Sequence, residues 1–196
     1  LRSVVNCGKP LPEYEVEIRD HDGKVLPEKE IGKLFVRGVS VMREYFGDPK
    51  ATNEVLSKDK WLDTGDMAYL LDGCIYIAGR IKDLIIVNGK NHWPQDIEWA
   101  VEQLPGYRNG DIAAISIPGS GGEEIPTVLV HCRKKAPEDR KELLNTVKNH
   151  ILKSTGITCQ VVLVPPRTLP RTSSGKLSRT KARNKYLNGE LVPLTI

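Results

Sequence analysis

The sequence predicts a mixed fold, in which a β-rich, barrel-like subdomain precedes a small α+β domain with a three-stranded sheet and helices. Short β-type segments occupy the chain up to about residue 80, and longer helical patterns begin only after residue 82. A glycine-flanked, charged junction at 79–83 separates the two patterns. Because 196 residues are enough for two modest cores, we expect one domain over 1–81 and a second over 82–196.

The first part of the chain has the composition of strands joined by tight turns. Its clearest signal is Asp72-Gly73, which lies between two β-type segments and favours a hairpin with a type I′ turn. Tyr14, Val16 and Ile18 alternate with glutamates, as in a strand with one buried face. Strands are therefore expected at 14–18, 34–36, 67–71 and 74–78, with a single helix at 49–57.

The second part combines apolar strands with amphipathic helices. Leu84 to Val87 is a branched apolar run that is typical of a buried strand. Pro94 and Pro137 each suit the first turn of a helix, and apolar residues at helical spacing follow both. Strands are expected at 84–87, 112–117, 127–132 and 159–164, and helices are expected to begin at 94, 137 and 178.

Composition and charge are those of an ordinary soluble protein, with 39% hydrophobic residues, 28% charged residues and a net charge of +4. No apolar run approaches the ~20 residues that span a bilayer, and no signal peptide opens the sequence. We therefore expect a cytoplasmic protein without a membrane span. The first residue is Leu1, which indicates a piece of a longer chain. The cysteines and histidines are scattered, which favours reduced thiols and argues against a metal site.

Residues 167–185 contain seven cations and no acid. Such a run is most often a solvated face, and it is also compatible with a phosphate-bearing ligand, an acidic protein partner or nucleic acid. Nucleic acid is the least favoured partner, because no aromatic residue alternates with these cations to stack on bases. We expect no nucleic-acid binding.

Two charged residues follow a glycine close to predicted strands. Asp66 ends a Thr-Gly-Asp triplet, and its carboxylate can accept hydrogen bonds from the vicinal hydroxyls of a ribose. Arg80 follows Gly79, and its guanidinium can donate to sugar hydroxyls or phosphate oxygens. An Asx-type turn for Asp66 and a surface salt bridge for Arg80 are the structural alternatives.

Lys176 lies in a Ser-Ser-Gly loop between Arg171 and Arg179. A loop of this kind can carry an ammonium group to an anionic ligand, since lysine is a strong donor to phosphate and carboxylate. The segment is not a P-loop, because Leu177 follows the lysine and the upstream glycine of that motif is missing.

The order of four segments is more informative than any one of them. They are Asp63-Thr64-Gly65-Asp66, Gly79-Arg80-Ile81-Lys82-Asp83, Gly89 to Glu98, and Ser174-Gly175-Lys176. In this combination they resemble the late motifs of adenylate-forming enzymes, the superfamily of acyl-CoA synthetases, luciferases and nonribosomal peptide adenylation domains. The segments 91–94 and 186–191 are most similar to the C-terminal part of fatty acyl-AMP ligases.

The resemblance implies a role for five residues. Asp66 and Arg80 would bind the ribose of ATP, and Lys82 would be the hinge about which the second domain rotates. Lys176 would reach the acyl carboxylate and the α-phosphate, and Gly89 would lie on the path of a pantetheine arm. The substrates would be ATP and a fatty acid, with magnesium held by residues outside this chain. The partner would be an acyl carrier protein or a carrier domain of a polyketide or peptide synthase.

The same resemblance implies that residues 1–81 are the last subdomain of a large N-terminal domain, whose phosphate loop and acyl pocket precede residue 1. We therefore expect the chain to be inactive by itself. Two alternatives remain open: the same portion of an acyl-CoA synthetase, and a non-catalytic module of this fold that binds acyl groups or carrier proteins.

Overall fold

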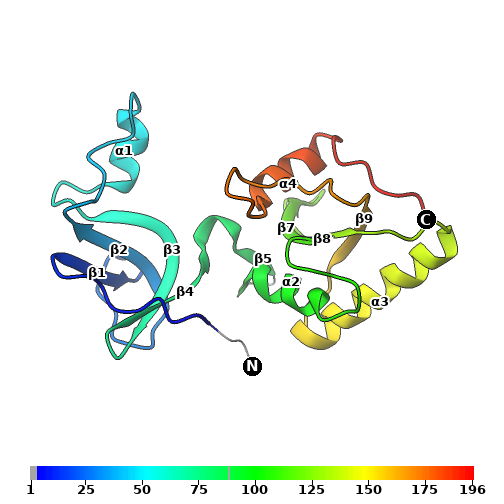
Figure 1. Cartoon of the computed structure of the whole chain (residues 1–196), viewed down its shortest axis with the longest axis horizontal. Coiled ribbons are helices and arrows are strands. Elements are labelled where there is room, and N and C mark those ends of the chain that lie inside the picture. The colour runs from blue at the N-terminus through cyan, green and yellow to red at the C-terminus, as the bar shows by residue number, and fades with distance from the viewer. Residues whose placement is uncertain (1–3, 88) are drawn as a thin grey trace. The chain divides into compact units, whose positions relative to one another are not determined.

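The computed structural model describes residues 4–87 and 89–196, and Figure 1 shows the path of the chain. The chain forms two compact units, Leu1–Lys82 and Asp83–Ile196. A β-rich first unit and an α+β second unit confirm the mixed fold class predicted from the sequence. The assignment of residues 1–81 to a larger domain, and of 82–196 to a mobile one, stays a prediction.

The first unit contains one antiparallel sheet with the strand order β1-β2-β3-β4. Its edges are β1 and β4 among the described residues, so the sheet is open and the barrel-like subdomain is not a closed barrel. One buried cluster, formed by Ile18, Leu34 and Ala68, packs on a face of this sheet. The elements of this unit are β1 (Tyr14–Arg19), β2 (Gly32–Gly38), α1 (Pro49–Val55), β3 (Leu62–Leu71) and β4 (Cys74–Arg80).

The hairpin between β3 and β4 turns at Asp72 and Gly73, as the sequence predicts. Both residues have positive φ angles, 53° and 71°, which a type I′ turn requires. The carboxylate of Glu28 accepts hydrogen bonds from the two backbone N–H groups at 3.0 and 2.9 Å. The turn sets the pairing of Leu71 with Cys74, and a shift in register between Met67 and Ala68 then places Asp66 opposite Arg80.

Within its described residues, the second unit contains a short hairpin, a three-stranded sheet and three α-helices. The hairpin was only half predicted, because its second strand is Lys-Asn-His and has no apolar alternation. The elements are η1 (Ile81–Asp83), a 3₁₀ turn at the boundary of the units, then β5 (Ile85–Val87), β6 (Lys90–His92), α2 (Pro94–Glu102), β7 (Ile112–Pro118), β8 (Glu124–His131), α3 (Pro137–Thr155), β9 (Gln160–Val164) and α4 (Arg179–Leu187).

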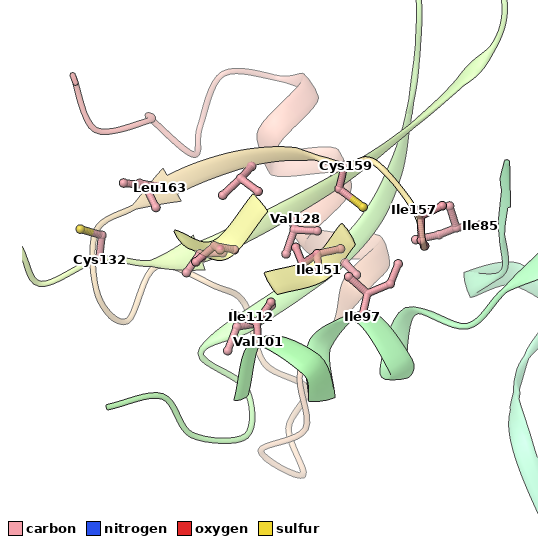
Figure 2. Packing of buried hydrophobic residues seen from close by; sticks show 14 residues of the cluster. Ile85, Ile97, Val101, Ile112, Val128, Cys132, Ile151, Ile157, Cys159 and Leu163 are labelled. Atoms are coloured by element: carbon pink, nitrogen blue, oxygen red, sulfur yellow. The ribbon is translucent and has the colours of Figure 1, made fainter. Parts of the chain in front are cut away.

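The three-stranded sheet is buried on both faces. Val128 and Val130 belong to a cluster with residues of α2 and α3, whereas Leu129 belongs to a second cluster with Ala182 of α4. Figure 2 shows the first cluster, in which side chains from the helices and from the strands lie together. Burial on both faces explains why these strands are continuous apolar runs and do not alternate with polar residues.

The sheet has the order β7-β8-β9, with β7 antiparallel and β9 parallel to β8. A parallel pair needs a crossover, and α3 supplies it. This helix ends at Thr155 and is capped by Gly156, which has a φ of 74° and donates its N–H to the carbonyl of Leu152. Among the described residues, no helix has both the length and the apolar composition needed to cross a bilayer.

Candidate functional site

Asp66 and Arg80 meet on neighbouring strands of the first unit. They are register partners across β3 and β4, and Nε of Arg80 lies 3.1 Å from Oδ1 of Asp66. The side chain of Asp66 is 21% exposed and that of Arg80 is 69% exposed, so the pair lies at the surface. A carboxylate acceptor beside a fork of donors can bind the vicinal hydroxyls of a sugar.

The local chain around Asp66 differs from the expectation in one respect. Asp66 lies inside β3, which begins at Leu62, and does not precede the strand. The strand is irregular here: Gly65 has a φ of 73°, and its N–H donates to the Asp63 carboxylate at 2.9 Å. The hydroxyl of Thr64 accepts the N–H of Asp66 and donates to the carbonyl of Leu34. These bonds hold the backbone that carries the carboxylate.

Lys82 and Gly89 flank the first strand of the second unit. Lys82 is exposed in the η1 turn and is the last residue of the first unit. Gly89 has a φ of 73° in the turn between β5 and β6, and a Cβ there would meet no atom within 4 Å. The left-handed backbone, and not crowding, is therefore what favours glycine. The hinge and pantetheine roles of these two residues stay predictions.

Lys176 lies in a short, self-bonded loop of the second unit. The N–H of Thr172 donates to the carbonyl of Lys176 at 2.8 Å, and the N–H of Lys176 donates to the hydroxyl of Thr172 at 3.1 Å. The N–H of Gly175 donates to the carbonyl of Thr172 at 2.9 Å. The backbone of the lysine is thus ordered by its own loop, while its side chain is exposed. We call residues 170–178 the lysine loop.

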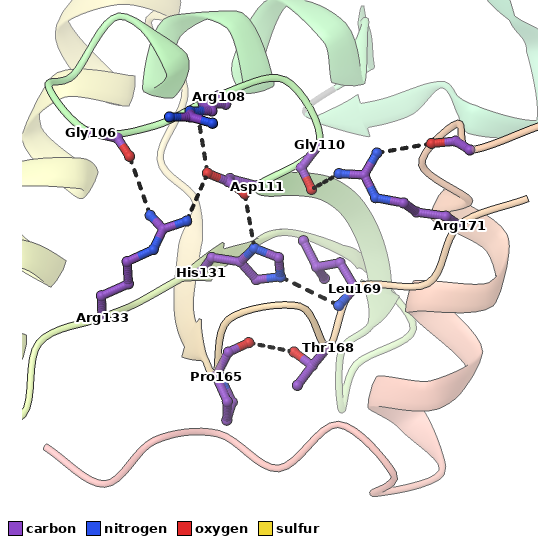
Figure 3. Close-up of polar contacts among 11 residues, drawn as sticks. Gly106, Arg108, Gly110, Asp111, His131, Arg133, Pro165, Thr168, Leu169 and Arg171 are labelled. Carbon is purple, nitrogen blue, oxygen red and sulfur yellow. Dashed lines mark hydrogen bonds and ion pairs between the residues drawn. The ribbon is translucent and has the colours of Figure 1, made fainter.

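Arg171 anchors the lysine loop to the segment before β7, as Figure 3 shows. Its Nη1 donates to the carbonyl of Gly175 at 2.9 Å and its Nη2 to the carbonyl of Gly110 at 3.4 Å. Gly110 has a φ of 83°, and a Cβ there would lie 2.5 Å from Nη2 of Arg171. A side chain at position 110 would therefore displace the guanidinium that bridges the two segments.

A buried histidine makes a second connection to the same segment (Figure 3). The N–H of Leu169 donates to Nε2 of His131 at 3.4 Å, which leaves the proton on Nδ1 to donate to Asp111 at 3.1 Å. Burial opposes ionisation of Asp111, but its hydrogen bond with His131 and the charge of Arg133 hold its pKa below the usual value. Asp111 and His131 thus hold Leu169, the residue that precedes the lysine loop.

Arg179, the first residue of α4, lies between two carboxylates. Its Nε and Nη2 bond the two oxygens of Glu98 at 2.7 and 2.6 Å, and its Nη1 bonds Asp83 at 2.9 Å. Burial raises the pKa of Glu98, and the hydrogen bond and charge of Arg179 oppose that rise. Burial lowers the pKa of Arg179, but Glu98 and Asp83 outweigh it and raise the pKa overall.

Sequence reasoning missed the carboxylates of this cluster and the Asp111–His131 pair. For Glu98 a signal was present, because it stands between Ile97 and Val101 on a predicted helix and so close to its buried stripe. For His131 the signal was a polar residue at the end of the apolar run of β8. No group of three or more His, Cys, Asp or Glu side chains suited to a metal ion is present in residues 4–87 and 89–196.

Three comparisons agree on the class of protein to which this fold and these residues belong. A putative acyl-CoA synthetase of Caulobacter vibrioides is 46% identical over 96% of this chain. A solved structure from a study of fatty acyl-adenylate ligases of E. coli and L. pneumophila matches 95% of the chain with a TM-score of 0.83 and 41% identity. A McyG A-PCP structure with phenylalanyl-adenylate matches 96% with a TM-score of 0.85 and 29% identity. The class is that of adenylate-forming enzymes.

Two family models match the chain. One is described as the AMP domain of Disco-interacting protein 2-like proteins and covers residues 82–195; the other is AMP-binding enzyme and covers residues 1–46. The chain belongs to the Disco-interacting protein 2-like AMP-domain family of the adenylate-forming superfamily and is similar to fatty acyl-AMP ligases. It spans 33% of the Caulobacter relative, 33% of the adenylate ligase and 34% of the McyG chain, about one third of each.

Proposed function

We propose that the chain is the C-terminal part of a fatty acyl-AMP ligase, which uses ATP to activate a fatty acid as acyl adenylate and passes the acyl group to a carrier protein. One observation carries the proposal. The division between the units falls directly after Lys82, so that Asp66 and Arg80 belong to one unit and Lys176 to the other. A single rotation about this point would bring the lysine to the nucleotide or remove it.

In the first half-reaction, the carboxylate oxygen of the fatty acid attacks the α-phosphorus of ATP and the bond to pyrophosphate breaks. Asp66 would accept hydrogen bonds from the ribose hydroxyls, and Arg80 would donate to the same sugar. Because attack brings two anions together, the ammonium of Lys176 would stabilise the charge that develops between carboxylate and phosphate. The loop bonds that order Lys176 before substrate arrives support this role.

In the second half-reaction, the thiol sulfur of a phosphopantetheine arm attacks the acyl carbonyl and AMP leaves. This step does not bring a second anion to the phosphate. The ammonium of Lys176 is therefore not needed to offset the repulsion between a carboxylate and a phosphate. Lys176 would therefore move away as the second unit rotates about Lys82. Gly89, in the exposed turn between β5 and β6, would then lie on the path of the pantetheine arm. Magnesium would be bound by residues of the longer chain.

The acceptor thiol separates this proposal from the second candidate, an acyl-CoA synthetase. The name and 46% identity of the Caulobacter relative favour that candidate. The full-length parent protein, supplied with ATP and a long-chain fatty acid, is expected to release pyrophosphate and to acylate a holo carrier protein. Mass spectrometry of the carrier protein, with CoA in a parallel reaction, measures the choice. Acyl-CoA as the main product would replace the first candidate with the second.

The 196-residue chain alone is expected to release no pyrophosphate from ATP and a long-chain fatty acid. The physical reason is that the described residues supply only Asp66 and Arg80 for the ribose and Lys176 for the reacting groups. The acyl pocket and the loop that would bind the phosphates are expected in the preceding part of the parent. A coupled pyrophosphate assay, with the parent protein as the positive control, measures this. Release above the no-enzyme rate would mean that the chain contains a whole active site.

A further inference from the structure

The largely buried cluster of Arg179, Glu98 and Asp83 connects three separate segments of the second unit. The exposed fractions of these side chains are 18%, 9% and 14%. Glu98 lies on α2, and one of its oxygens also accepts the N–H of Ala114 in β7 at 3.0 Å. The guanidinium is therefore held against the core of the unit by a bidentate pair, and its remaining arm reaches Asp83.

The two ends of this connection lie next to residues with a role in the proposed reaction. Asp83 is the first residue of the second unit and follows Lys82 directly. Arg179 comes three residues after Lys176, at the exit of the lysine loop. The loop closes on itself just before Arg179, because the N–H of Ser178 donates to the carbonyl of Pro170 at 3.0 Å. The connection from the hinge to the backbone of Lys176 therefore runs through Asp83 and Arg179 and contains few rotatable bonds.

A role in stability alone does not account well for such a cluster. Buried ion pairs often contribute no more than well-packed apolar residues of similar volume, because desolvation of the charges offsets their attraction. A planar guanidinium differs from an apolar side chain because its hydrogen bonds are directional. Its fork of donors fixes the angle at which both carboxylates approach. The cluster is suited to setting geometry.

We infer that Arg179 and Asp83 are positioning residues, which lock the lysine loop to the first residue after the hinge so that Lys176 follows any rotation about Lys82. The inference rests on the proposed adenylate-forming reaction. Neither side chain needs to touch substrate. Their effect on the rate would act through Lys176 alone, and this distinguishes a positioning role from general support of the fold.

Asp83→Ala in the full-length parent tests the inference, because Arg179 keeps its bidentate pair with Glu98. The variant is expected to slow acyl-adenylate formation by about 10-fold or more, as a displacement near 1 Å can do. In a Lys176→Ala background, the same change should cost less than about two-fold, because the group it positions is gone. Asp83→Asn keeps an oxygen acceptor for the guanidinium and should retain most of the rate.

Glu190→Gln is the matched control, since it removes one carboxylate from an exposed pair with Lys185 in the same unit. It should leave the rate unchanged. Equal losses from Asp83→Ala in the two backgrounds would show a merely structural role and overturn the inference. So would an unchanged rate of the single variant in a parent that makes acyl adenylate.

Hydrogen exchange gives a readout that does not depend on activity. In the parent protein, Asp83→Ala should speed exchange at the amides of Thr172, Gly175 and Lys176 while the amides of β8 keep their protection. Unchanged exchange in the lysine loop would overturn the inference. If the wild-type parent makes no acyl adenylate, the proposed function fails by itself, and the exchange result still decides whether the hinge and the loop are coupled.

Discussion

In the parent protein, Lys176→Ala is expected to slow acyl-adenylate formation by about 10²–10³-fold, the loss seen when one positioned donor to a developing charge is removed. Transfer of the acyl group from a supplied acyl adenylate should stay within about two-fold of wild type, because that step does not bring two anions together. Pyrophosphate release measures the first half-reaction, and thioester formation from synthetic acyl adenylate measures the second.

Lys181→Ala is the matched control for this experiment. It removes an exposed cation from α4, close to the lysine loop, and changes the net charge by the same amount. It is expected to leave the rates of both half-reactions unchanged, because salt screens an exposed charge that does not contact the reacting groups. Acyl-adenylate formation that survives undiminished in Lys176→Ala would leave the lysine without a catalytic role. The proposed role of the lysine loop in acyl-adenylate formation would then be wrong.

Arg179→Met is expected to lower the free energy of unfolding of the second unit by about 3–5 kcal/mol, the cost of breaking a buried pair and leaving its partner charged or newly protonated. Glu98 loses both bonds to the guanidinium in this variant and keeps only the N–H of Ala114. Hydrogen exchange at the slowest amides of β7, β8 and β9, measured in the 196-residue chain, reports this free energy.

The double variant Arg179→Met/Glu98→Gln provides the control for the cause of this loss. Glutamine keeps an oxygen for the N–H of Ala114 and carries no charge, so it should recover about 1–2 kcal/mol of the stability lost by Arg179→Met. A double variant less stable than the single one would mean that the lost packing of the arginine stem, and not the unpaired carboxylate, explains the effect.

Local patterns predicted most of the fold, because most of its elements depend on residues close in sequence. The Asp72-Gly73 turn and the apolar runs of β7, β8 and β9 are examples. Two local features were not predicted. The strand β6 is polar and lies in a short hairpin, and β3 begins at Leu62, before the irregularity at Gly65 that resembles a turn. Strand pairing overrides the local pattern in both places.

For the candidate site, the order of the motifs predicted the residues that would touch substrates. It did not predict the side chains that contact and support those residues. Asp66 and Arg80 were predicted separately, and the hairpin register brings them together. Arg179 meets Glu98 and Asp83 across 81 and 96 residues of sequence, a distance over which no periodicity or spacing carries information. Each of these charged residues, taken alone, is of a type that most often lies at the solvated surface. Only the three-dimensional structure shows which residue each of them pairs with.

The sheet β7-β8-β9 is covered on both faces by helices and segments of its own unit, and the first unit has a separate apolar cluster. A change in the orientation of one unit therefore need not bring these core side chains into water. If Lys82 is the hinge that we propose, a rotation about it would leave the side chains of these clusters buried within their own units. Binding of a nucleotide or of an acyl adenylate would then need to supply only a few kcal/mol to shift the molecule from one population to the other.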